Sequence, residues 1–172
     1  MKKAIKLLVS LCIIAGGIFA FNYFPVAQPL SEVLKSETRN SGMNIRAHYG
    51  YYVQPTVLAI DVRDISGEKS AADVFRVFLQ YASKLKEKSF DTVLLQSKGK
   101  TKFLLEGDYF QRLGNEYGSQ NPVYTMRTFT ENVFTPDGKK AFGTWSGGLL
   151  GVLKEQMEDF GEFHKAWYIE DM

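Results

Sequence analysis

Ser146 and His164 are the two residues whose types could support nucleophilic catalysis. Ser146 lies in the segment from Thr144 to Gly148, which departs from the G-x-S-x-G pattern of a serine nucleophile only at its first position. In a serine hydrolase, His164 would act as the base, and Asp61 or Asp159 would orient it. A serine placed here is also a common cap of the helix that follows it. We favour the capping interpretation, with catalysis as the alternative.

Metal and cofactor sites have no recognisable pattern in the chain. His48 and His164 lie far apart, and neither has a partner at the spacing of metal ligands. The single cysteine, Cys12, lies inside an apolar run, so the rest of the chain has no thiol ligand or thiol nucleophile. The glycines around Gly151 follow neither the phosphate-loop nor the dinucleotide-binding spacing. We therefore predict no metal and no cofactor.

Two groups of residues are candidates for binding rather than catalysis. Tyrosines supply rigid, amphipathic contact area for a protein or a glycan, although they serve the edges of a core equally well. Alternating lysines could contact phosphate or anionic lipid, although they also protect exposed sheet edges from aggregation. The candidates are Tyr49, Tyr51 and Tyr52 in one segment and Lys98, Lys100 and Lys102 in another.

Positive charge is concentrated at the N-terminus. The whole chain has a formal net charge of +2, but Lys2, Lys3 and Lys6 precede or open the first apolar run. Without these three lysines, 18 basic residues face 19 acidic ones, a net charge of −1. Binding to nucleic acid depends on clustered Lys and Arg at the phosphates. We therefore predict no nucleic-acid partner.

Residues 7–24 form an apolar run of 18 residues, interrupted by few polar side chains. A membrane-spanning helix needs about 17–25 apolar residues, and lysines before it keep the N-terminus in the cytoplasm. We predict a signal-anchor over residues 1–24, with Phe21, Tyr23 and Phe24 at the membrane interface. Two alternatives stay open. Cleavage after Ala20 would release a secreted protein, and a soluble protein could bury the same segment as a helix.

Residues 25–42 are rich in Pro, Ser and Asn and predict a linker, followed by one globular domain over residues 43–172. Residues 122–134 are ambiguous. The Val, Tyr, Thr and Phe content of 123–130 favours a strand, whereas Asn121 and Pro122 would start a helix well; we expect a strand. The other expected strands are 44–53, 56–65, 92–96, 101–105 and 140–145, and the expected helices are 70–88, 107–117 and 146–167.

Strands interrupted by amphipathic helices predict an α+β fold, an antiparallel or mixed sheet with helices on one face. We expect a non-enzymatic, membrane-anchored binding or accessory domain of the bacterial envelope, with an envelope protein as its partner. The short lysine leader and the absence of disulfides and N-x-S/T sites favour a bacterial inner membrane, with the domain periplasmic or extracellular. The alternatives are a small envelope serine hydrolase using Ser146 and His164, or a small-molecule-binding domain.

Overall fold

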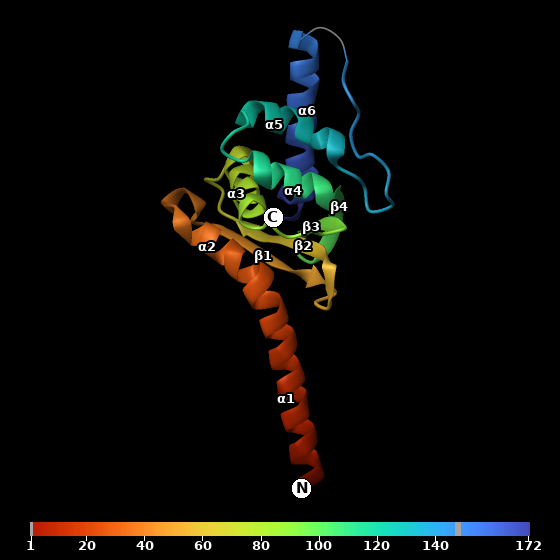
Figure 1. Cartoon of the computed structure of the whole chain (residues 1–172). Coiled ribbons are helices and arrows are strands. Elements are labelled where there is room, and N and C mark those ends of the chain that lie inside the picture. The colour runs from red at the N-terminus through yellow and green to blue at the C-terminus, as the bar shows by residue number, and fades with distance from the viewer. Residues whose placement is uncertain (1, 147–148) are drawn as a thin grey trace.

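A computed structural model describes residues 2–146 and 149–172. Its centre is a four-stranded sheet in the order β1-β2-β3-β4, with helices on one face and a long helical stalk at the N-terminus (Figure 1). The elements are α1 (Lys2–Asn22), η1 (Tyr23–Ala27), α2 (Gln28–Ser36), η2 (Thr38–Asn40), β1 (Met43–Gly50), β2 (Gln54–Ile65), α3 (Ala71–Lys84), β3 (Thr92–Ser97), β4 (Lys100–Glu106), α4 (Gly107–Glu116), α5 (Pro122–Phe129), η3 (Thr130–Asn132), α6 (Leu149–Trp167) and η4 (Ile169–Asp171).

The sheet is mixed. Strands β1 and β2 form one antiparallel hairpin and β3 and β4 form another, while β2 and β3 pair in parallel. A parallel pair needs a crossover connection, and α3 supplies it by returning the chain from the end of β2 to the start of β3. The predicted α+β fold, with helices packed on one face of the sheet, is confirmed.

Alternate residues of β1 divide the sheet into a core face and an outer face, as the two-residue period of a strand requires. Ile45 and Ala47 are buried towards the helices, whereas Arg46 is exposed and His48 is half-buried on the opposite face. The helices complete the core with a dense group of aromatic rings. The rings buried there include Phe75, Phe78, Phe110, Phe129, Phe160, Phe163 and Trp167.

Two amphipathic helices account for most of this aromatic core. Helix α3 begins with a capping box, in which Ser70 and Asp73 satisfy each other's backbone N–H groups. Helix α6 is buried only over its C-terminal half, where the Trp167 indole N–H donates to the Gln96 carbonyl at 3.1 Å. Its N-terminal half projects away from the sheet (Figure 1).

The strand expected over residues 123–130 is a helix instead. Asn121 caps it by accepting a hydrogen bond from the Val123 N–H, and Pro122 occupies the first turn. Local start signals therefore outweigh strand propensity here. The strand expected over 140–145 is reduced to a single bridge, in which Lys140 pairs with Phe134.

The linker expected over residues 25–42 is largely helical and belongs to the folded body. Val26, Leu30 and Val33 are buried in the core, and the Tyr81 hydroxyl donates to the Val26 carbonyl at 2.8 Å. The helix runs from α1 through the π-helical η1 into α2 and bends as it enters the body (Figure 1). Prolines 25 and 29 each lack the N–H of a regular helix, which explains the bend. The stalk is thus joined to the body without a flexible tether.

Candidate functional site

Ser146 and His164 are not brought together. Ser146 is exposed before the start of α6, whereas His164 lies fully buried near the end of that helix. From Leu149 to His164 the helix rises by about 22 Å at 1.5 Å per residue. A serine nucleophile needs its histidine within hydrogen-bond distance, so this pair does not form a catalytic site. A capping bond from Ser146 would involve residues 147–148, which lie outside the described part of the chain, so the cap stays a prediction.

His164 is part of the aromatic core. The rings of Phe160 and Phe163 lie 4.6 and 4.9 Å from its own, centroid to centroid, and the Tyr168 hydroxyl is 3.2 Å from its Nδ1. Burial penalises the charged imidazolium and lowers the pKa of His164 to about 3. The side chain is therefore neutral at physiological pH and has a packing role.

Two of the three candidate lysines bind the C-terminus of the chain. Lys102 forms an ion pair with Asp171 at 2.9 Å, and Lys98 donates to the Asp171 backbone carbonyl. The hydrogen bond from Lys102 is the largest cause of a lowered pKa at Asp171. Lys100 is exposed. The lysine hairpin therefore does not present three free charges to a ligand.

The three candidate tyrosines separate into a core residue and two surface residues. Tyr49 is buried, and burial raises the pKa of its hydroxyl. Tyr51 and Tyr52 are exposed at the tip of the β1–β2 hairpin. His48 stacks on Tyr52, with the two ring centroids 4.2 Å apart. An exposed aromatic surface therefore exists at this tip, but it is smaller than the sequence pattern suggests.

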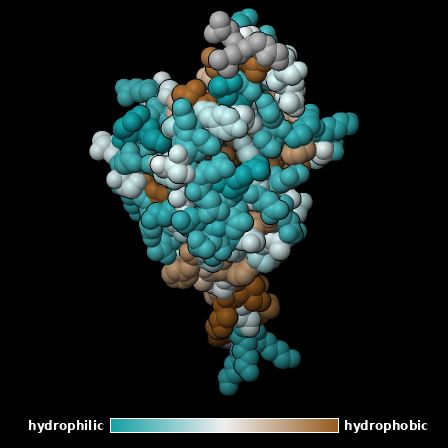
Figure 2. Space-filling model, turned by 45° about the horizontal axis from the view of Figure 1, so that its top comes forward, coloured by the Kyte–Doolittle hydropathy of each residue, from teal (hydrophilic) through white to brown (hydrophobic). Residues whose placement is uncertain are grey.

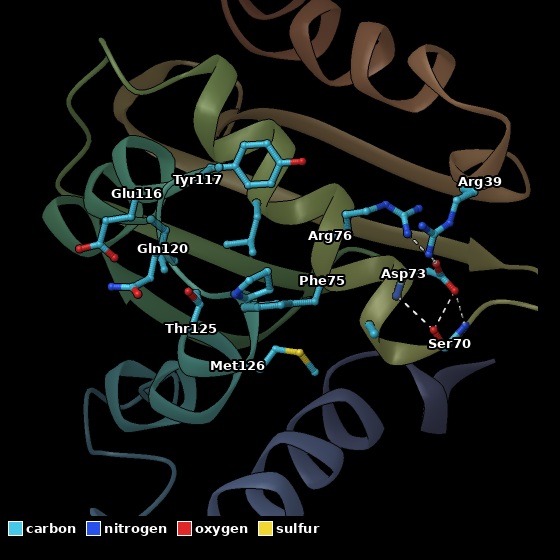
Figure 3. Close-up of a pocket in the computed structure, with 15 residues that line it drawn as sticks. Arg39, Ser70, Asp73, Phe75, Arg76, Glu116, Tyr117, Gln120, Thr125 and Met126 are labelled. Atoms are coloured by element: carbon cyan, nitrogen blue, oxygen red, sulfur yellow. Dashed lines mark hydrogen bonds and ion pairs between the residues drawn. The ribbon is translucent and has the colours of Figure 1, made fainter.

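A groove between α3, α4 and α5 has a volume of about 490 Å³ (Figure 3). That volume lies within the range of about 300–1,000 Å³ that is usual for small-ligand sites. Phe75 and Leu79 from α3, Leu113 from α4 and Met126 from α5 supply its apolar lining. Tyr117, which follows α4, lies along one side with its ring partly exposed.

Charged residues stand at both ends of this groove. At one end, the Arg76 and Arg39 guanidinium groups reach the same Asp73 oxygen at 2.7 and 3.2 Å (Figure 3). Hydrogen bonds from the Ser70 hydroxyl, and then from Arg76, hold the pKa of Asp73 well below its usual range. Two guanidinium groups against one carboxylate leave this end with a net positive charge. Glu116 places a carboxylate at the other end.

Asn40 fixes the position of the Arg76 side chain. Its carbonyl oxygen accepts from the Arg76 guanidinium at 2.8 Å, and its amide donates to the Val33 carbonyl at 2.7 Å. Arg39 is tied down less, since its side chain is 71% exposed. One arginine is therefore held in place, and the other can turn towards a ligand.

Gly114 explains why α3 and α4 come close at one side of the groove. A Cβ atom there would lie 2.4 Å from the Ala82 carbonyl oxygen, so any other residue would push the helices apart. Helix α4 ends soon afterwards, and Gly118 takes a left-handed φ of 89° as the chain turns towards α5. The groove lies between this close pair of helices and α5.

The described residues that line the groove include no histidine or cysteine. Ser70, its hydroxyl-bearing residue nearest to the charged end, donates to Asp73 at 2.7 Å within the capping box. Among the residues that the structure describes, no group of three or more His, Cys, Asp or Glu side chains could hold a metal ion. An apolar lining with a fixed arginine is suited to binding.

Comparisons with protein-family models, with curated proteins and with solved structures give no match.

Sequence reasoning missed the groove because its residues come from four separate segments. One signal was available: Phe75 and Leu79 are apolar but lie outside the stripe formed by the other large apolar residues of α3. Apolar residues on two sides of a helix indicate two packing surfaces. No sequence pattern indicated that Arg39 would lie beside the groove.

Proposed function

We propose that this chain is a single-pass membrane protein whose outer domain binds a ligand in the groove between α3, α4 and α5. The ligand has an apolar body and a carboxylate, as an apolar C-terminal residue of a peptide or a small aryl or acyl acid would have. The domain acts by binding and has no catalytic role.

The observation that carries this proposal is the combination of an apolar groove wall with a positively charged end. Phe75, Leu79 and Leu113 are largely buried in the core and add their remaining surface to the groove. Arg76, held by Asn40, adds a guanidinium in a fixed orientation. Planar guanidinium groups suit carboxylates, and a few polar groups set the orientation of a ligand in an otherwise apolar site.

Membrane anchoring is supported by α1. This helix is long and apolar enough to cross a membrane, and none of its most apolar 18-residue window is buried in the protein. A helix of this kind in a soluble protein would be covered by its own chain. The same length and composition also occur in signal sequences.

The join between α1 and the body favours an uncleaved anchor. Asn22 is buried, and its side chain bonds to the Tyr49 N–H, the Tyr52 carbonyl and the Ile18 carbonyl. Cleavage after Ala20 would remove the last of these bonds and leave a charged amine beside the ring pair of Phe21 and Tyr49. Because Lys2, Lys3 and Lys6 favour the cytoplasmic side, we place the N-terminus inside and the body on the outer side of a bacterial inner membrane.

The groove can be tested with methyl NMR of the full chain in phospholipid nanodiscs. The chain has five methionines, of which Met126 lines the groove and Met157 lies exposed on α6. The probes are 4-phenylbutyrate and 4-phenylbutylamine, which share an apolar body and differ in charge. We expect the carboxylate to shift the Met126 methyl signal at lower concentration than the amine does, while Met157 stays unchanged.

Arg76→Gln should abolish the preference for the carboxylate. Arg63→Gln is the matched control, because Arg63 also pairs with an aspartate, at 2.9 Å, but lies on the sheet outside the groove. An unmoved Met126 signal with both probes would rule out ligand binding in this groove. Equal responses to both probes would rule out the carboxylate.

Anchoring can be tested separately by extraction of membranes with alkaline carbonate. The full chain should stay in the membrane pellet because a spanning helix is not released by high pH. Recovery of the full-length or shortened chain in the soluble fraction would contradict the anchor.

A further inference from the structure

The tip of the β1–β2 hairpin carries exposed apolar side chains where α1 enters the body. Tyr51, Tyr52 and Val53 are 88%, 54% and 61% exposed. The Asn22 side chain, at the end of α1, donates to the Tyr52 carbonyl and accepts from the Tyr49 N–H, each at 2.8 Å. The tip is therefore fixed beside the last turn of α1.

The backbone of this tip is one that glycine or asparagine adopts more readily than tyrosine. Tyr51 and Tyr52 have φ angles of 47° and 64°, in the left-handed region. The turn is held by hydrogen bonds from the Tyr52 N–H to the Tyr49 carbonyl and from the Val53 N–H to the Gly50 carbonyl. Tyrosine is an unfavourable residue for this backbone, and both side chains are exposed. The combination indicates that the exposed rings have a function.

A second groove, of about 510 Å³, joins this hairpin to α1. Its lining includes Ala15, Ile18 and Phe19 from the helix and Arg46, His48 and Tyr52 from the hairpin. The three helix residues lie inside the apolar run 7–24. The hairpin tip is thus level with residues that the anchor places in the membrane or at its surface.

Arg46 supplies a free positive charge to this groove. Asp61 is its cross-strand neighbour, but that carboxylate accepts from Arg63 at 2.9 Å and from the Gly99 N–H at 3.0 Å. Within residues 2–146 and 149–172, Arg46 forms no ion pair. A guanidinium beside an apolar groove matches a phospholipid, whose phosphate lies next to its acyl chains.

We propose that the β1–β2 hairpin is a second membrane-contacting element, which rests on α1 being the membrane anchor. Tyr51, Tyr52 and Val53 enter the headgroup layer, where tyrosine is enriched, and Arg46 pairs with the phosphate of an anionic phospholipid in the groove. Apolar surface covers the stalk above its hydrophilic tip and continues, more weakly, where the stalk joins the otherwise mostly hydrophilic face of the body (Figure 2). Two attachments hold the body in one orientation on the membrane.

Single cysteines carrying an environment-sensitive fluorophore can test this in the full chain, in nanodiscs that contain phosphatidylglycerol. Native Cys12 reports on α1. Gln54→Cys and Lys154→Cys, each with Cys12→Ser, report on the intact hairpin tip and on the far end of α6. Nitroxide lipids quench from the membrane, and iodide quenches from water. We expect lipid quenching at positions 12 and 54 and iodide quenching at position 154.

Removing the two rings should move the tip into water. Tyr51→Asn with Tyr52→Asn suits the left-handed backbone, so the hairpin keeps its fold, and iodide quenching at position 54 should rise to the level at position 154. Arg46→Gln should weaken the association of nitroxide-labelled phosphatidylglycerol by about fivefold, because one basic residue near an anionic surface contributes about that factor. Arg112→Gln is the control, because Arg112 is exposed on α4 outside this groove, and it should leave the association unchanged.

Four results would overturn the proposal or one of its parts. Lipid quenching at Cys12 with iodide quenching at position 54 would refute the hairpin contact and leave the anchor intact. Protection of position 54 from both quenchers would mean that protein covers the tip, as a second copy of the chain would. Iodide quenching at Cys12 would refute the anchor and the hairpin contact together. An Arg46→Gln variant with unchanged lipid association would refute the phosphate pairing.

Discussion

The two ends of the body use aromatic rings in opposite ways. Around α6 the rings pack edge to face, with Phe160 5.1 Å from Phe75 and Phe163 5.0 Å from Phe129, measured between centroids. Beside α1 the rings of Phe24 and Tyr51 are exposed. The first group obtains its dry surroundings from its own chain. The second group has no such cover from its own chain, and we propose that a membrane provides it, because the group lies beside an apolar helix.

Buried polar side chains differ between these ends as well. Asn22, the last residue of α1, makes three side-chain hydrogen bonds, and two of them join the helix to the hairpin. His164, in the C-terminal half of α6, bonds through Nδ1 to Tyr168, and its Nε2 is buried with no partner among the described residues. The polar side chain in α1 therefore connects two elements, whereas the one in α6 packs as a neutral ring in the core.

The largest expected effect separates buried rings from exposed ones. Trp167→Ala should lower the free energy of unfolding by about 3–5 kcal/mol, because it leaves a cavity in the aromatic core. Tyr51→Ala should change it by less than about 0.5 kcal/mol, since an exposed ring packs against little. Urea unfolding of the full chain in detergent micelles measures both. Similar losses at the two positions would contradict the comparison.

The next effect is the pH dependence due to His164. Its pKa is about 3 in the folded protein against 6.5 when solvated, so the unfolded chain binds the proton more readily and stability falls as the pH drops below 6.5. Between pH 8 and pH 4.5 this group should remove about 2–3 kcal/mol.

His164→Met removes the titrating group and should remove that part of the pH dependence, as measured by urea unfolding at both pH values. His48→Gln is the matched control and should retain it. An identical pH dependence in wild type and His164→Met would show that His164 is not held neutral by burial.

Asn22→Ala tests the connection between α1 and the hairpin. The change leaves the Tyr49 N–H without its acceptor and should cost about 1–3 kcal/mol of unfolding free energy. Asn44→Ala is the control, because Asn44 is exposed on β1, the strand that also contains Tyr49, and it should cost less than about 0.5 kcal/mol. Equal effects of the two changes would mean that Asn22 is no more than a surface residue.

The smallest effects concern two helix caps. Ser70→Ala removes the observed cap of α3 and should lower stability by about 0.5–2 kcal/mol. Ser146→Ala should do the same at α6, and Ser146→Asp should restore it, because aspartate also caps a helix. Thermal melts of the three variants and of the wild type measure these changes in stability. A Ser146→Ala variant as stable as wild type would leave this serine without a capping role.

Local sequence patterns predicted the elements that depend on local interactions. The expected helix 70–88 starts, as α3, at the capping box of Ser70 and Asp73, and the expected strands 92–96 and 101–105 are joined by a turn in which Gly99 has a φ of 84°. The strand predicted from the residue types of Val123 to Thr130 was wrong, because this segment is helical. At the outer edge of β4, Leu104 exchanges two backbone hydrogen bonds with Phe134. A strand formed by residues 123–130 could not pair with β4 at that position.

Features that depend on distant segments could not be predicted in the same way. Pro25, Pro29 and nearby Ser and Asn residues indicated a linker, yet three apolar residues among them complete the core. The groove needs Arg39 beside a helix that begins 32 residues later, at Ala71. Asn22 is one polar residue within the apolar run 7–24, and only the position of the hairpin shows which groups its side chain binds.

The central claim is that α1 crosses a membrane and leaves the body on its outer side. The most direct measurement is labelling of spheroplasts with a membrane-impermeant maleimide, using Lys3→Cys and Lys154→Cys in a Cys12→Ser background. We predict that Lys154→Cys reacts in intact spheroplasts, whereas Lys3→Cys reacts only after lysis. Reaction of Lys3→Cys in intact spheroplasts, or protection of Lys154→Cys until lysis, would contradict this account.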